Sequence, residues 1–202
     1  MKFLLMRGWG VWLLAPAVAF ICAVPCRASD YPTYEAHPDY IGGYPAEAET
    51  DYSDECQGLA DDQDHWYITS RNRIWRSPVW RSLGSVGYGA EGVTYTSINV
   101  QWPLWDNGYD HLGDPDVYTD GGTDYLLVPI EGGSPGPGIA AFRADYLAYP
   151  PSLGVLSEGG APWCAVDNEG RLFATPYRDV GTLFSYGVDW DAVEDDPNFD
   201  LV

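Results

Sequence analysis

The chain carries one pattern three times, first as Cys56-Gln-Gly-Leu-Ala-Asp-Asp-Gln-Asp-His-Trp-Tyr-Ile-Thr69 followed by Asn72-Arg-Ile-Trp-Arg-Ser-Pro-Val79. The second copy begins with His111-Leu-Gly-Asp-Pro-Asp-Val-Tyr118 and the third with Pro162-Trp-Cys-Ala-Val-Asp167. Each copy has an opening strand-like run, an acidic turn and a second apolar run, in the same order. A repeat of about fifty residues predicts that one supersecondary unit recurs in the fold.

The segments inside each copy are short, rich in β-branched and aromatic residues, and separated by turn-forming residues. Examples of these turns are Asp106-Asn-Gly108, Asp120-Gly-Gly122 and Asn168-Glu-Gly170. No window of the chain keeps the 3.6-residue apolar period that an amphipathic helix needs. We therefore predict an all-β domain of antiparallel sheets over residues 56–190.

The repeated stretches resemble the blades of secreted β-propeller proteins. The start of a blade resembles Cys56-Gln-Gly-Leu-Ala60 followed by the aromatic run Trp66-Tyr-Ile-Thr69. The hairpin of a blade is similar to Ala165-Val-Asp-Asn-Glu-Gly-Arg-Leu-Phe173. The resemblance implies a β-propeller-like arrangement of the sheets. Propellers close with four to eight blades, whereas this chain supplies about three, so we expect an incomplete ring.

An incomplete ring leaves three alternatives open. The chain is a fragment of a longer ancestor, it borrows blades from a second copy, or its repeats pack as an open stack or sandwich. Unpaired strand edges at the two ends would favour self-association.

Residues 1–28 have the features of a secretory signal peptide. Lys2 and Arg7 supply the charged start, an apolar run follows, and Cys26-Arg-Ala28 ends the segment. A membrane anchor is the alternative, but the run is shorter than the ~20 apolar residues that a span needs. We expect cleavage after Ala28 and a secreted protein, extracellular or periplasmic, that has no membrane partner.

Residues 29–55 are rich in Tyr, Pro, Asp and Glu and have no apolar periodicity. A segment of this composition buries too little apolar surface to offset its ordering entropy, which predicts a disordered acidic arm. A docking segment built on its tyrosines is the alternative. Residues 191–202 form a mostly acidic tail, and this composition argues against a tail that folds back on the domain.

The chain is strongly acidic, with a formal net charge of −20. Removal of the leader takes three of the ten basic residues and none of the thirty acidic ones, which makes the charge −23. A negative field of this size repels nucleic acid and anionic lipid and favours cations. Solubility in a salty medium is the plainer explanation of the charge.

Two cysteines remain after cleavage, Cys56 and Cys164, and they occupy parallel places in two repeats. Disulfides form and persist in exported proteins. We predict a Cys56–Cys164 bridge, with two buried thiols as the alternative.

Aspartates crowd the turns of the repeats, and calcium takes six to eight oxygen ligands of this kind. The candidate calcium ligands are Asp61, Asp62, Asp114, Asp116 and Asp167. Solvated turns are the alternative, because aspartate favours turns through its hydrogen bonds to the backbone.

Two further groups are candidates for chemistry. His111, with Asp110 and Asp114 beside it, has the residue types of a general base and its partner. Trp102 and Trp105 flank two residues in a predicted loop, where flat rings are suited to stack on a sugar or an apolar ligand. Tryptophans that fill a core are the alternative.

These observations predict a secreted β-repeat binding module without catalysis of its own, which engages a protein, a glycan or a cation through its rim loops. The alternative is a metal-assisted propeller hydrolase that uses calcium, similar to lactonases or phytases. That alternative needs carboxylates from several repeats to converge.

Overall fold

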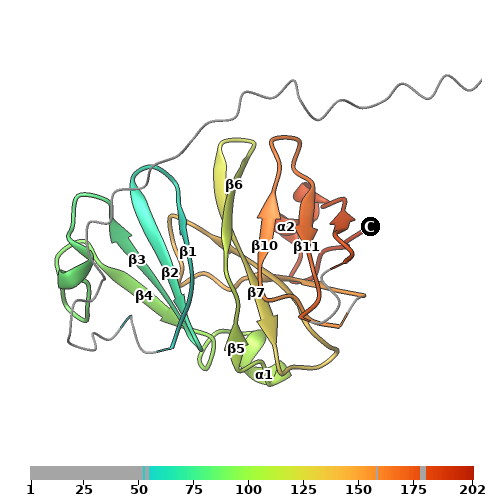
Figure 1. Ribbon diagram of the computed structural model, residues 1–202, viewed down its shortest axis with the longest axis horizontal. Helices are drawn as coiled ribbons and strands as arrows, with labels where there is room; N and C mark the ends of the chain where they lie inside the picture. The colour runs from blue at the N-terminus through green and yellow to red at the C-terminus, as the bar shows by residue number, and fades with distance from the viewer. Residues whose placement is uncertain (1–51, 53–54, 158, 178–180) are drawn as a thin grey trace, which may run out of the picture. The chain divides into compact units, whose positions relative to one another are not determined.

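The computed structural model describes residues 52, 55–157, 159–177 and 181–202, all within a compact unit of residues 42–202 (Figure 1). The predicted leader and most of the predicted arm lie outside the described residues, so both stay predictions. The described part of the chain is built of antiparallel sheets with very little helix, which confirms the all-β prediction.

The first repeat forms a four-stranded antiparallel sheet in which each strand pairs with the next in sequence. Its strands are β1 (Cys56–Asp61), β2 (His65–Ser70), β3 (Arg73–Pro78) and β4 (Thr94–Ser97). Side chains alternate between the two faces of a strand, so Tyr67 joins the core shared with the second sheet while Ile68 packs on the opposite face with Trp75 and Val86. The loop after β3 therefore covers part of this opposite face.

The second repeat forms the central sheet. Its strands are β5 (His111–Leu112), β6 (Asp116–Asp120), β7 (Thr123–Glu131), β8 (Gly138–Arg143) and β9 (Ser152–Val155). Both β5 and β6 pair with β7, and β8 and β9 follow outward. Leu126 and Val128 of β7 face the core shared with the first sheet, whereas Leu127 faces the core of the third. This burial on both faces explains the unbroken apolar run of β7.

The third repeat forms a three-stranded sheet of β10 (Cys164–Val166), β11 (Leu172–Ala174) and β12 (Phe184–Tyr186). The segment that follows contains α2 (Trp190–Asp195), whose N-cap Asp189 accepts a hydrogen bond from the backbone N–H of Ala192. The tail does fold back, contrary to the expectation from its acidic composition. Val193 and Phe199 are buried in the third core, and the backbone of Leu153 exchanges hydrogen bonds with the tail.

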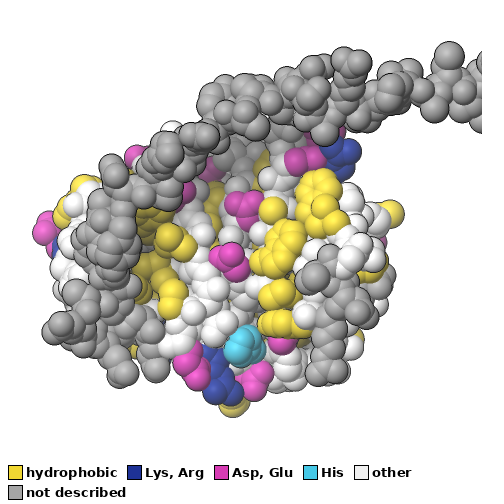
Figure 2. Space-filling view, in the orientation of Figure 1, with side chains coloured by type: hydrophobic (Ala, Val, Ile, Leu, Met, Phe, Trp, Pro, Cys, Tyr) yellow, Lys and Arg dark blue, Asp and Glu magenta, His cyan; other side chains and the backbone are white. Residues whose placement is uncertain are grey.

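The opening strands of the three repeats lie side by side, with β6 between β1 and β10 (Figure 1). An oxygen of Asp114 accepts a hydrogen bond of 2.9 Å from the backbone N–H of Leu59, and an oxygen of Asp116 accepts one of 2.7 Å from that of Val166. A Cβ atom at position 58 would clash with Asp114, so the close approach requires Gly58. On the face shown in Figure 2, acidic side chains accordingly lie in the strip between two bands of hydrophobic ones.

Candidate functional site

The best candidate for a binding site is a cavity of about 300 Å³ with aromatic walls. The side chain of Trp102 is 53 % exposed and that of Tyr149 is 55 % exposed, although large aromatic side chains are usually buried. The cavity is lined by Trp102, Tyr149, Pro150, Pro151, Ser152, Asp196 and Pro197.

One wall of the cavity is held in place by Gln101, which is buried beside Trp102. Its side-chain amide donates hydrogen bonds to the hydroxyl of Thr96 on β4 and, over 3.3 Å, to the carbonyl oxygen of Leu147. The loop that carries Trp102 is thereby tied to the β8–β9 connection that carries Tyr149. Both rings are presented by a fixed framework.

The opposite wall depends on the C-terminal tail. The hydroxyl of Ser152 lies 2.7 Å from the carbonyl oxygens of both Val193 and Asp196, within hydrogen-bonding distance of each. The backbone N–H of Leu153 donates to the carbonyl oxygen of Pro197. The tail thus closes the cavity against β9.

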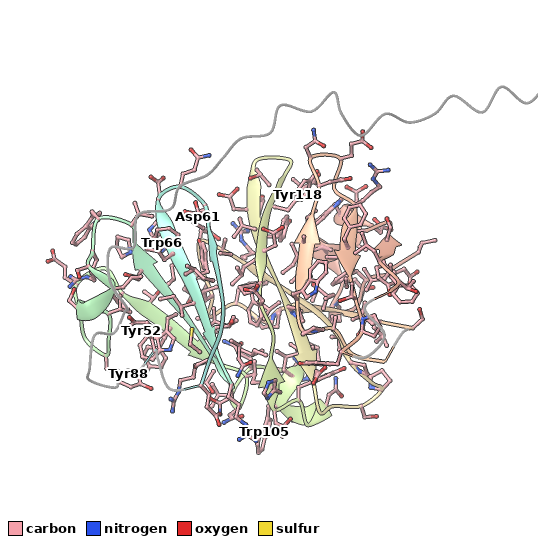
Figure 3. All side chains as sticks on the ribbon, viewed as in Figure 1. Tyr52, Asp61, Trp66, Tyr88, Trp105 and Tyr118 are labelled. Atoms are coloured by element: carbon pink, nitrogen blue, oxygen red, sulfur yellow. The ribbon has the colours of Figure 1, made fainter. Side chains whose placement is uncertain are left out.

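Trp105 does not line this cavity. It belongs to α1 (Leu104–Asn107), is 62 % exposed, and projects from the lower end of the molecule in Figure 3. The structure therefore separates the two predicted ligand-binding tryptophans and pairs Trp102 with Tyr149. We did not predict Tyr149 from the sequence, although a tyrosine before Pro150 and Pro151 is a signal that could have identified it.

A second cavity of about 260 Å³ adjoins the first. It is lined by Tyr125, Ala141, Arg143, Tyr149, Pro150, Ser152 and Val193, three of which line both cavities. The guanidinium of Arg143 donates two hydrogen bonds of 3.2 and 3.1 Å to the carboxylate of Asp145. These bonds lower the pKa of Asp145, and the positive charge of Arg76 lowers it further.

Asp62 is part of a polar network in which its carboxylate already has three donors. It accepts hydrogen bonds from the backbone N–H groups of His65 and Asp64 and from the hydroxyl of Tyr67, at 2.6, 2.9 and 2.6 Å. Burial acts to raise the pKa of Asp62, but these hydrogen bonds outweigh it and the pKa is lowered. Burial also raises the pKa of Tyr67, whose hydroxyl reaches the carbonyl oxygen of Ala144, just after β8 of the second sheet.

The other predicted calcium ligands are occupied with the backbone or with arginine. Asp61 accepts from the N–H of Gln63, and Asp167 binds Arg171 at 2.8 Å and caps its own hairpin. Asp114 and Asp116 join the sheets, as described above. Within the described residues, no three His, Cys, Asp or Glu side chains are grouped so that they could hold a metal ion. The five aspartates therefore do not form one site.

The predicted group of His111, Asp110 and Asp114 is divided in the structure. Asp114 accepts from Leu59, whereas His111 lies opposite Glu131 in the pairing of β5 with β7. Burial raises the pKa of Glu131, and the nearby His111 and a hydrogen bond from the hydroxyl of Tyr177 partly oppose this. Neither Glu131 nor Tyr177 was predicted, because each is far from His111 in sequence and only the fold brings Glu131 opposite His111 and Tyr177 to Glu131.

Both predicted bridge cysteines are free thiols. Cys56 is exposed at the start of β1, whereas Cys164 is buried and its sulfur lies 3.5 Å from the carbonyl oxygen of Leu127 in the second sheet. Burial raises the pKa of both thiols, that of Cys164 strongly. The structure thus lacks the predicted bridge, because Cys164 faces the core.

Neither a protein-family model, nor a curated protein, nor a solved structure matches this chain. Among the described residues, no helix has the length and apolarity needed to cross a membrane.

Proposed function

We propose that the protein is a secreted binding module without catalysis of its own, which holds its ligand in the cavity between Trp102 and Tyr149. The observation that carries the proposal is the pair of rings, each more than half exposed, in the walls of one cavity. Aromatic rings with one exposed face supply much of the contact energy in binding sites.

The support behind the two rings favours binding over accidental exposure. Gln101 and Ser152 are buried and hydrogen-bonded to the segments that form the cavity walls. Loops that a rigid scaffold holds in place are the usual carriers of binding residues. A rigid cavity loses little entropy when it takes a ligand.

The proposal includes a propeller-like arrangement in which the three sheets are three blades. Two features support it. The strands of the first and third repeats pair in sequence order, and β6 of the second repeat lies beside their opening strands, β1 and β10. Asp114 and Asp116 connect the central opening strand to both neighbours in the same way. Incomplete closure leaves the strand edges available for self-association.

A calcium-dependent hydrolase is the weaker proposal. It would need a convergent set of carboxylates, and the five candidate aspartates are instead engaged with backbone N–H groups, with Tyr67 or with Arg171. The same engagement makes a cation the least favoured ligand of the module.

The proposal is tested with Trp102→Ala and with Trp105→Ala as its matched control, because Trp105 is similarly exposed but lies outside the cavity. The probes are neutral saccharides, proline-rich peptides and calcium, followed through the indole N–H resonances of the two tryptophans. We expect one class of probe to shift the indole resonance of Trp102. The affinity for that probe should fall about tenfold or more in Trp102→Ala and stay unchanged in Trp105→Ala. Equal binding by both variants, or no response of Trp102 to any probe, would contradict the proposal.

A further inference from the structure

The cleft continues beyond the Trp102 cavity. The two cavities have Tyr149, Pro150 and Ser152 in common, so they meet at these three residues. A ligand that fills the first cavity and extends past Tyr149 enters the second. The two volumes, about 300 and 260 Å³, provide two places of similar size.

The two places differ in chemistry. The first offers the exposed rings of Trp102 and Tyr149. The second is lined by Arg143, whose guanidinium donates to the carboxylate of Asp145, a residue outside the cavity lining. The side chain of Arg143 is 40 % exposed, so solvent reaches it. A guanidinium has five N–H donors, so it can donate hydrogen bonds to the oxygens of hydroxyl groups.

The ligand class follows from this order of groups and from the charge of the chain. An anionic ligand is disfavoured by the net charge of −20. A proline-rich peptide binds along successive aromatic slots, but beyond Tyr149 the second cavity offers only Tyr125, which is 3 % exposed. A saccharide chain presents apolar ring faces and hydroxyl edges, which match stacking rings followed by a guanidinium.

We propose that the cleft binds a neutral saccharide of at least two units, with one unit stacked between Trp102 and Tyr149 and the next hydrogen-bonded by Arg143. This rests on the proposed function, because it uses the same cavity. It adds the ligand class and a second subsite.

The test uses the full chain and neutral saccharides of glucose, N-acetylglucosamine, mannose and galactose, from single units to chains of several units, in titration calorimetry. Arg143→Lys keeps the charge but loses the planar fork of the guanidinium. Its matched control is Arg171→Lys, because Arg171 also pairs with an aspartate but lies outside both cavities. We expect chains to bind more tightly than single units, and Arg143→Lys to cost about tenfold for chains and nothing for single units.

The outcomes separate the two proposals. If a proline-rich peptide binds in a way that depends on Trp102 and no saccharide binds, the saccharide assignment is wrong. The proposal that the protein is a binding module would still hold. Chains that bind no better than single units, or equal effects of Arg143→Lys and Arg171→Lys, would overturn the second subsite. Saccharide binding that is the same in Trp102→Ala and Trp105→Ala would overturn both proposals.

Discussion

Tyr67 connects the first two sheets through one hydroxyl group. It donates to Asp62 in its own sheet and lies 3.1 Å from the carbonyl oxygen of Ala144, just after β8 of the second. Arg76 donates to the same hydroxyl over 3.3 Å and also contacts His65. Hydrogen bonds to charged groups contribute about 1.5–3 kcal/mol each, so Asp62 and Arg76 hold the hydroxyl of Tyr67 in place where the first repeat meets the second.

The lowered pKa of Asp62 makes its contribution depend on pH. A lowered folded-state pKa stabilises the fold above the unfolded pKa of about 3.9, and this stabilisation is lost as the pH falls through the folded value. We expect Asp62→Asn to lower the free energy of unfolding by about 1–3 kcal/mol at pH 7. In denaturant unfolding, the difference in free energy of unfolding between Asp62→Asn and the unmodified protein should become smaller below about pH 4.

The control for this prediction is Asp106→Asn, which changes an exposed aspartate of α1 and should leave the free energy of unfolding unchanged over the same pH range. If the loss of unfolding free energy caused by Asp62→Asn stays constant from neutral to acidic pH, the carboxylate charge is not the source of the stabilisation.

At the scale of elements, the C-terminal tail behaves as part of the fold. Its ring at Phe199 is 4 % exposed and lies so close over Gly154 of β9 that a Cβ atom there would clash with it. The tail also provides Asp196 and Pro197 to the binding cavity. The order of this segment therefore supports both the third core and the candidate site.

Phe199→Ala should lower the free energy of unfolding by about 3 kcal/mol, because it removes a buried ring and leaves a cavity. Val202→Ala is the matched control in the same segment, since Val202 is 88 % exposed and should be neutral. Thermal and denaturant unfolding measure both. Equal stability of the two variants would mean that the tail is the loose acidic segment that its composition suggests.

At the scale of the whole chain, the described sheets keep open edges. Among the described residues, β4 pairs only with β3 and β12 only with β11. Leu183, just before β12, is 58 % exposed. An unpaired strand edge with an exposed apolar side chain is a site for pairing with a second copy.

We expect the molecular mass measured by light scattering to rise with protein concentration. Leu183→Lys should reduce this association, because a charged side chain at a sheet edge disfavours pairing. Trp105→Lys is the control, because Trp105 is 62 % exposed but belongs to α1 and not to a strand edge. A monomer at all concentrations would contradict the prediction of association.

The sequence by itself determined the type of local structure. Alternating β-branched and aromatic runs and turns such as Asn168-Glu-Gly170 act within a few residues, so the strands and hairpins of each repeat could be predicted from them. The exposure of Trp102 in a loop was also predictable, since Pro103 and Gly108 mark the loop locally.

Only the tertiary structure decided which distant residues meet. Tyr149 joins Trp102 because Gln101 ties two loops together, and Asp114 turns from His111 to Leu59 because the opening strands lie side by side. The acidic tail is ordered by Phe199, one buried ring whose packing outweighs the average composition around it. Such contacts depend on the packing of whole sheets, and no short-range pattern in the chain encodes them.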